Sequence, residues 1–381
     1  MSQSRKCVPK RRFMEFNNAV AWEQRKLGKE VENVATGRST FFTSIEQSSE
    51  TPYAVLGSTS VISYDKNFDH SGDFILTARV GANAGNLYKY SGDVKISDNT
   101  VYIQAKSLDF VYYLLNKFDL KRLSFGTGQP LVKASELKNL KLMFPNDEEE
   151  QQKIGKFFKY LDDTIALHQR KLEKIKALKT AYLSEMFPAE GETKPKRRFA
   201  GFTDDWEQRK FIEIINRLSK TSNSSILPKV EYEDIIAEEG RLNKDISNKF
   251  DSRKGILFQP NNILYGKLRP YLKNWLYPDF KGVAVGDFWV FEAIEATPRF
   301  IYNLIQSDSY QKAANDTAGT KMPRSDWTKV SNSSFFIPEE SSEQKIIGTF
   351  FKQLDNTIAL HQRKLQKLQN IKKAYLNEMF I

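Results

Sequence analysis

Hydrogen-bonding and cationic side chains recur at equivalent places in two segments of this 381-residue chain. The candidates of the first segment, residues 27–148, are Arg79, Asn83, Asn86, Lys89, Gln129 and Lys133. The candidates of the second segment, residues 211–340, are Lys267, Arg269, Lys273, Lys321 and Arg324. Arginine and lysine pair with guanine edges, asparagine and glutamine pair with adenine edges, and further cations bind phosphates. Each residue taken alone is as typical of a solvent-exposed strand face as of a DNA contact. Because such residues recur at equivalent places in both segments, we favour base readout.

Motifs for catalysis are missing from the sequence. Three histidines and the single Cys7 are too few for a conventional structural zinc site, and no GxxxxGK[ST] phosphate loop is present. The sequence also has no glycine-rich methyltransferase loop with an Asn/Asp-Pro-Pro-aromatic motif. Asp279 and Glu292 resemble part of a nuclease pattern whose lysine is missing here. We therefore predict that the chain is not an enzyme and has no metal site.

The charge balance and the cysteine content limit the kind of protein further. Lysine and arginine outnumber aspartate and glutamate by 58 to 47, which gives a net charge of +11 and favours polyanionic partners. One cysteine allows no disulfide within the chain and indicates a reducing compartment. No run of 18 apolar residues is present, and the N-terminus lacks the apolar stretch of a secretory signal. We expect a cytoplasmic protein.

The chain contains an internal repeat, in which one sequence unit occurs twice. PKRRF occurs at residues 9–13 and 195–199, and WEQRK occurs at residues 22–26 and 206–210. DDTIALHQRKL at residues 162–172 returns as DNTIALHQRKL at residues 355–365. The segments between these matches keep the same order but have diverged. The repeat therefore predicts two similar helices that carry two different globular domains.

The repeated segments carry the apolar pattern of a coiled coil. Positions alternate at steps of four and three over more than four heptads, a spacing that predicts a long helix with a packed seam. The predicted seam residues are Phe158, Leu161, Ile165, His168 and Leu172 in the first helix, and Phe351, Leu354, Ile358, His361 and Leu365 in the second. The duplication favours antiparallel packing of the two helices about a pseudo-two-fold axis. Leu183 and Leu376 lie outside the seam and are candidates for docking a partner protein.

The globular segments contain β-like runs and short helices. Strands are predicted near residues 73–80, 100–105, 262–268 and 283–291, and helices near residues 107–118 and 298–306. Each segment ends with a glycine-containing loop, at residues 126–130 or 319–323, and a last apolar strand. The predicted class is α+β: two mixed α/β domains and two long antiparallel coiled-coil helices, related by a pseudo-two-fold internal repeat.

In combination, these motifs resemble those of the specificity subunits of type I restriction-modification systems. The family pattern includes Trp-Glu-x-x-Lys/Arg-Leu, then Pro-x-Glu-Gln, Ile-Gly-x-Phe-Phe-x-x-Leu-Asp-x-x-Ile and Lys-x-x-Tyr-Leu-x-x-Met-Phe. Here they stand at residues 22–27, 145–151, 154–165 and 179–187, and again at 206–211, 338–344, 347–358 and 372–380. Two departures are Phe211 in place of the usual leucine and a first glycine loop without the usual basic residue before its proline.

The resemblance implies a sequence-reading subunit of a larger complex. Residues 1–148 and 189–341 would form the two target-recognition domains, each reading one half of a bipartite, asymmetric DNA site. Residues 149–188 and 342–381 would form helices that set the gap between the half-sites and dock two methyltransferase subunits, with two restriction subunits as further partners. S-adenosylmethionine, ATP and magnesium would bind the partner subunits only.

Two other functions fit parts of the sequence. A non-catalytic coiled-coil scaffold explains the helices but leaves the basic, diverged domains without a role. An RNA-binding module needs exposed aromatic side chains on which single-stranded bases stack. Competition between duplex DNA and single-stranded RNA for the assembled complex would separate these alternatives.

Overall fold

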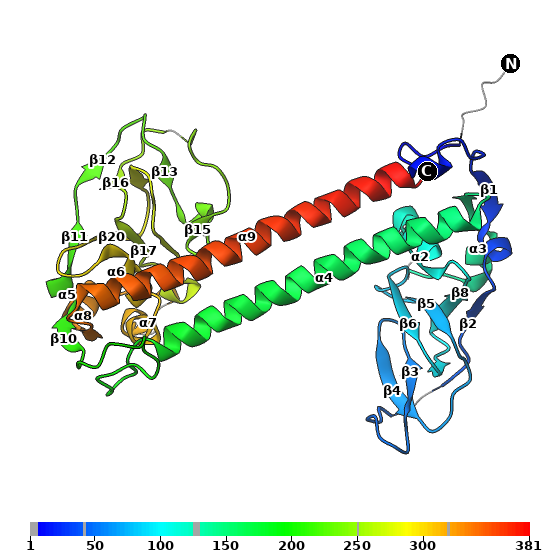
Figure 1. Cartoon of the computed structure of the whole chain (residues 1–381), viewed down its shortest axis with the longest axis horizontal. Helices are drawn as coiled ribbons and strands as arrows, with labels where there is room; N and C mark the ends of the chain where they lie inside the picture. Colours follow the sequence, from blue (N-terminus) through cyan, green and yellow to red (C-terminus); the bar gives the residue numbers. More distant parts are fainter. Residues whose placement is uncertain (1–6, 41–42, 125–129, 250, 318–320) are drawn as a thin grey trace. The chain divides into compact units, whose positions relative to one another are not determined.

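The computed structural model describes residues 7–40, 43–124, 130–249, 251–317 and 321–381. It divides into two compact units (Figure 1). Unit 1 combines Met1–His168 with Lys364–Ile381, and unit 2 consists of Gln169–Arg363. Each unit therefore contains one globular domain, the adjoining part of the long helix that follows it, and part of the other long helix.

The domain of unit 1 is built on two sheets. The larger sheet has the order β2-β8-β5-β6, and the smaller has the order β4-β3-β7. A third, two-stranded sheet pairs β1 with β9 just before the long helix begins. The strands are β1 (Glu23–Lys26), β2 (Asn33–Thr36), β3 (Tyr53–Leu56), β4 (Val61–Asp65), β5 (Asp73–Ala78), β6 (Leu87–Ser91), β7 (Val94–Ile96), β8 (Thr100–Gln104) and β9 (Lys141–Phe144). The helices are η1 (Met14–Phe16), α1 (Leu27–Glu30), α2 (Leu108–Phe118), η2 (Leu120–Ser124) and α3 (Ala134–Asn139).

The domain of unit 2 repeats this plan with more strands. Its two main sheets have the orders β11-β20-β17-β18 and β12-β16-β19-β13, and β10 pairs with β21 as β1 pairs with β9. The strands are β10 (Glu207–Lys210), β11 (Ile215–Leu218), β12 (Thr221–Ser222), β13 (Lys229–Val230), β14 (Ile235–Ile236), β15 (Arg241–Leu242), β16 (Gly255–Phe258), β17 (Ile263–Gly266), β18 (Trp275–Leu276), β19 (Gly282–Ala284), β20 (Phe288–Ala293) and β21 (Ser334–Ile337). The helices are α5 (Phe211–Ile214), η3 (Tyr232–Asp234), η4 (Pro270–Leu272), α6 (Pro298–Leu304), α7 (Asp308–Asn315) and α8 (Trp327–Asn332).

The mixed helix and sheet content confirms the predicted α+β class, with three differences in detail. The run predicted at residues 283–291 is two strands, β19 and β20, because the chain turns at Gly286, whose φ of 103° suits glycine. The helices predicted from residues 107 and 298 start at Leu108 and Pro298 and end at Phe118 and Leu304. Helix α7 was not predicted, since its eight residues are mostly polar and span only about two turns.

The two long helices, α4 (Glu148–Glu185) and α9 (Ser341–Met379), bury the predicted seam. Of the ten seam residues, Phe158, Leu161, His168, Leu172, Phe351, Ile358 and Leu365 are buried, and Ile165, Leu354 and His361 are half-buried. In unit 1 the start of α4 lies beside the end of α9 (Figure 1), and the Phe157 and Tyr375 ring centroids are 5.3 Å apart. In unit 2 the end of α4 lies beside the start of α9, with 5.0 Å between Tyr182 and Phe350. The helices are antiparallel within each unit, as predicted.

Each unit has a cluster of four aromatic rings in its core. In unit 1, Phe380, just after α9, lies 5.5–6.2 Å from Trp22, Phe110 and Phe158, measured between ring centroids. In unit 2, Phe187, just after α4, lies 5.5–6.3 Å from Trp206, Phe300 and Phe351. The repeated tryptophan and the repeated Met-Phe sequence therefore meet in the core of each unit.

The repeated PKRRF sequence supplies a buried ion pair. Arg12 donates two hydrogen bonds of 2.6 Å to Glu150 in the first turn of α4, and the two side chains are 4% and 0% exposed. The Trp22 indole N–H donates to the same carboxylate at 3.4 Å. In unit 2, Arg198 donates to Glu343 at 2.6 and 2.8 Å. Each ion pair therefore joins the segment before a domain to the start of the long helix that follows that domain.

Candidate nucleic-acid interface

In unit 1, the chain beyond β5 is joined to the segment before α3. The Gly81 N–H donates to the Pro130 carbonyl at 3.0 Å, and the Val132 N–H donates to the Arg79 carbonyl at 2.8 Å. These two bonds flank an isolated antiparallel bridge between Val80 and Leu131. We call residues 79–81 and 130–132 the first loop pair. The structure thus brings together two candidate segments that lie about 50 residues apart in the sequence.

Unit 2 builds the same arrangement from different residues. The Arg269 N–H donates to the Pro323 carbonyl at 2.7 Å, and the Ser325 N–H donates to the Lys267 carbonyl at 2.8 Å. An antiparallel bridge between Leu268 and Arg324 lies between these bonds. We call residues 267–269 and 323–325 the second loop pair. The two loop pairs have equivalent backbones and different side chains.

Three candidates of unit 1 lie in or near the first loop pair: Arg79 and Asn83 are exposed, and Asn86 is half-buried. Arg79 is exposed, and its guanidinium has no ion pair among the residues that the structure describes. Asn83 and Asn86 lie on the turn between β5 and β6, where the Asn86 amide donates to the Asn83 side chain at 3.2 Å. Glycines with positive φ flank this turn, at 92° for Gly81 and 87° for Gly85, so the backbone can turn sharply there.

Two candidates of unit 2, Lys267 and Arg324, lie beside one carboxylate. Asp287 accepts a hydrogen bond from Arg324 at 3.1 Å and lies 3.7 Å from the Lys267 ammonium. The hydrogen bond to Asp287 raises the pKa of Arg324, so this side chain is a permanent cation. Arg269 has a φ of 48°, and its Nε is buried without a hydrogen-bond partner among the described residues. A strained backbone and an unsatisfied donor at one residue are typical of a binding site.

The remaining candidates lie outside the loop pairs. Lys89 pairs with Asp109 at 2.5 Å and lies 4.7 Å from the Tyr112 ring centroid. Lys133 lies 3.7 Å from Glu136, one turn further along the chain, and Lys273 pairs with Glu238 at 3.1 Å. Lys321 is exposed. Gln129 lies outside the described residues, as do most of the two glycine loops.

Sequence reasoning missed one position beside each loop pair, Asn99 in unit 1 and Asp287 in unit 2. The Arg79 N–H donates to the Asn99 carbonyl at 2.9 Å, and the Lys267 N–H donates to the equivalent Asp287 carbonyl at 2.9 Å. Asn99 immediately precedes β8, and Asp287 immediately precedes β20. The exposed Asn99 amide is therefore a further readout candidate. Its only sequence signal is the equivalence of the two positions in the repeat.

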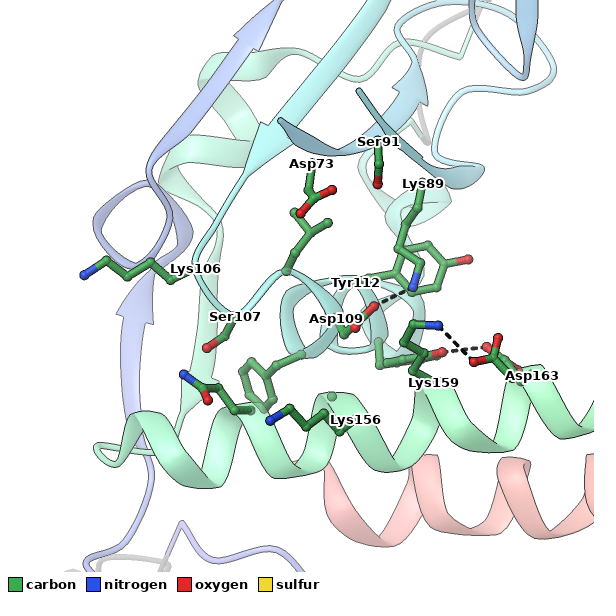
Figure 2. Close-up of a pocket in the computed structure, with 16 residues that line it drawn as sticks. Asp73, Lys89, Ser91, Lys106, Ser107, Asp109, Tyr112, Lys156, Lys159 and Asp163 are labelled. Atoms are coloured by element: carbon green, nitrogen blue, oxygen red, sulfur yellow. Dashed lines mark hydrogen bonds and ion pairs between the residues drawn. The ribbon is translucent and has the colours of Figure 1, made fainter. Parts of the chain in front are cut away.

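A pocket of about 720 Å³ in unit 1 lies between β5, β6, α2 and α4 (Figure 2). Its charges are largely paired: Lys89 with Asp109, and Lys159 with Asp163 at 2.9 Å on the same face of α4. The hydrogen bond that Lys159 donates to Asp163 raises the pKa of Lys159. Because most of its charge is neutralised internally, this pocket is a weaker polyanion site than the first loop pair.

The docking candidates on the long helices are half-buried. Leu183 packs against the core of unit 2, and Leu376 packs against the core of unit 1. Leu167 and Leu360, which are equivalent in the repeat, are 44% and 58% exposed. The structure therefore gives Leu183 and Leu376 a role in packing and leaves Leu167 and Leu360 as exposed apolar positions.

The residues that the structure describes contain no group of three or more His, Cys, Asp or Glu side chains that could hold a metal ion. None of their helices combines the length and apolar character needed to cross a lipid bilayer.

Two equivalent loop pairs on one repeated framework define a class of protein with two similar globular domains, each followed by a long helix. The sequence pattern of the family described as "Type I restriction modification DNA specificity domain" matches residues 19–177 and again residues 203–370. Because these two matches together cover most of the chain, it belongs to this family.

Individual relatives agree with this assignment. The chain is 23% identical over 325 residues to the type I restriction enzyme MjaVIII specificity subunit of Methanocaldococcus jannaschii, covering 78% of this chain and 76% of that protein. It is 25% identical over 99 residues to the EcoprrI specificity subunit of Escherichia coli, a quarter of each chain. Its fold is similar to the crystal structure of a type I restriction-modification S subunit from M. genitalium. That match has a TM-score of 0.68 and 16% identity, and it covers 98% of this chain and 99% of the other.

Proposed function

We propose that this protein is the DNA-specificity subunit of a type I restriction-modification complex. Each recognition domain reads one half of a bipartite DNA site through its loop pair. The chain itself is non-catalytic, and the bound methyltransferase and restriction subunits supply all chemistry and bind S-adenosylmethionine, ATP and magnesium.

The observation that carries this proposal is the contrast between the two loop pairs. Their backbone hydrogen bonds are equivalent, but Arg79, Val80 and Gly81 stand where unit 2 has Lys267, Leu268 and Arg269. A repeated framework places both sets at the same point of a domain, and different side chains there select different bases. This arrangement suits an asymmetric site with two unlike halves.

Comparing adenine modification in cells with and without this gene tests the proposal. We expect a set of modified adenines that depends on the gene and shares two short sequences at a fixed separation. Purified complex should retain duplex DNA carrying this site on a filter and release it as salt increases, because binding displaces counterions from the phosphates. A genome whose modification does not change on deletion of the gene would overturn the proposal.

Substitutions in the loop pairs should each affect one half-site. Arg79→Ala is expected to relax one base position of the first half, and Arg269→Ala one position of the second. Loss of a bidentate base contact costs about 1–3 kcal/mol of binding free energy. Binding to a library of randomised half-sites measures both effects, with Lys106→Ala as a control because Lys106 is exposed in unit 1 but lies outside the loop pair. Equal weakening for all sequences would mean that the arginine contacts phosphate instead.

The methyltransferase partners require a protein surface, for which the long helices are our candidates. Leu183→Asp and Leu376→Asp are expected to abolish co-purification with the methyltransferase subunit and also to lower the unfolding temperature, because each places an unpaired charge against a core. The exposed pair Leu167→Asp and Leu360→Asp separates docking from folding: we expect reduced co-purification at an unchanged unfolding temperature. Normal complex yield with this pair would place the docking surface elsewhere.

A further inference from the structure

Two equivalent aspartates each join the long helices to a recognition domain. In unit 1, Asp162 on α4 pairs with Lys372 on α9 at 2.5 Å, and its other carboxylate oxygen accepts a hydrogen bond from Tyr113 on α2 at 2.7 Å. In unit 2, Asp355 on α9 pairs with Lys179 on α4 at 2.7 Å and with Arg299 on α6 at 3.3 Å. We call these sets the first and the second tie.

The second tie is largely shielded from solvent, which distinguishes it from an ordinary surface ion pair, whereas the first tie is partly exposed, with the Lys372 and Asp162 side chains 26% and 34% exposed. The Lys179 side chain is 9% exposed and also donates to Gln306 at 2.9 Å, while Asp355 is 19% exposed. In unit 1, Tyr113 is buried. Burial is the larger cause and the hydrogen bond to Asp162 the next, and both raise the pKa of the Tyr113 hydroxyl, so the hydroxyl keeps the proton that it donates. Figure 2 shows this part of α4 beside α2.

Stability alone is a poor explanation for these charges. A lysine in an apolar seam loses solvation, and well-packed apolar residues in place of a buried ion pair are often neutral or stabilising. The best-attested gain from a polar seam residue is a unique register. Here each aspartate adds a second constraint, since it also contacts a helix of the recognition domain.

Comparison of the two copies of the repeat shows which residues of each tie are shared and which differ. The aspartate and lysine are the same in both units and lie on the long helices. The domain partner differs: a tyrosine of α2 in unit 1 and an arginine of α6 in unit 2. The common carboxylate is therefore a fixed attachment point on the helices for domains whose own sequences have diverged.

We propose that the residues of two ion pairs, Asp162 with Lys372 and Asp355 with Lys179, are positioning residues. Each pair holds one recognition domain in one orientation on the helix pair, and this fixes the gap between the half-sites. This inference rests on the proposed function. When two linked sites bind one DNA, the second binding event depends on the effective concentration of its domain at its half-site. A loosened domain lowers that concentration without changing the contacts within either half-site.

The test uses the complex with its methyltransferase subunits and three duplexes: both half-sites at the native gap, both at a gap one base pair longer, and the first half-site alone. For Asp162→Asn and Tyr113→Phe, we expect affinity for the native-gap duplex to fall about tenfold. The preference for the native gap over the longer one should fall with it, and affinity for the single half-site should not change. Asp162→Glu keeps the carboxylate and should restore part of the preference.

Asp163→Asn is the matched control, because Asp163 pairs with Lys159 on its own helix and not with a domain. It should leave all three affinities unchanged. Equal weakening of the bipartite and single half-site duplexes by Asp162→Asn would show a role in folding only and overturn the proposal, as would no change at all. A wild-type complex with no preference for the bipartite duplex would overturn the proposed function itself.

Discussion

Replacing Glu150 with alanine is expected to lower the free energy of unfolding of unit 1 by about 3–5 kcal/mol. The carboxylate is fully buried and accepts both hydrogen bonds from Arg12, so its removal leaves a guanidinium without a partner where solvent cannot reach it. The Trp22 indole loses its acceptor at the same time. Hydrogen exchange resolved by segment measures the effect, and it should appear as lower protection in unit 1 with unit 2 unaffected.

Glu149→Ala is the matched control for this change. Glu149 lies next to Glu150 in the first turn of α4 but is exposed, so its loss removes only a favourable interaction with the helix terminus, worth about 0.3–1 kcal/mol. Glu343→Ala should destabilise unit 2 in the same way, though by less, because Arg198 is 16% exposed and can reach water. Similar unfolding of the Glu150→Ala and Glu149→Ala proteins would contradict this account.

Adding seven residues to both long helices is expected to lengthen the recognised site without changing either half-site. The insertions belong between His168 and Gln169 and between Arg363 and Lys364, because these are the boundaries of the two compact units and the contacts inside each unit then remain. Seven residues preserve the seam and add about 10.5 Å of helix. At about 3.4 Å per base pair, the gap should grow by at most about three base pairs. Genome-wide detection of modified adenines measures the new gap.

Insertions of five residues at the same two places serve as the comparison. They turn the seam away from its partner helix, so we expect loss of stability or of complex assembly instead of a longer gap. Modification at the original gap by a folded, seven-residue variant would refute the idea that the helices set the spacing.

The sequence by itself determined the plan of the molecule. The seam spacing predicted α4 and α9, since apolar positions at steps of three and four form one stripe on a helix, whatever lies around it. The matching segments predicted the duplication, and the duplication predicted antiparallel helices packed about a pseudo-two-fold axis. Strands β5 and β8 were also predictable, because each is a short apolar run between turn residues.

Only the tertiary structure decided which distant residues meet. Nothing local in the sequence pairs Gly81 with Pro130, or Lys179 with Asp355, because such contacts depend on how sheets and helices pack and not on the period of one segment. Only the folded structure likewise shows that Asp355 lies opposite Lys179 and that Asp162 lies opposite Lys372. Likewise, Leu183 was predicted on an outer helix face, but the domain of its unit covers that face. The periodicity of the sequence predicts which side of a helix is apolar. Only the packing of the folded chain determines which residues cover that side.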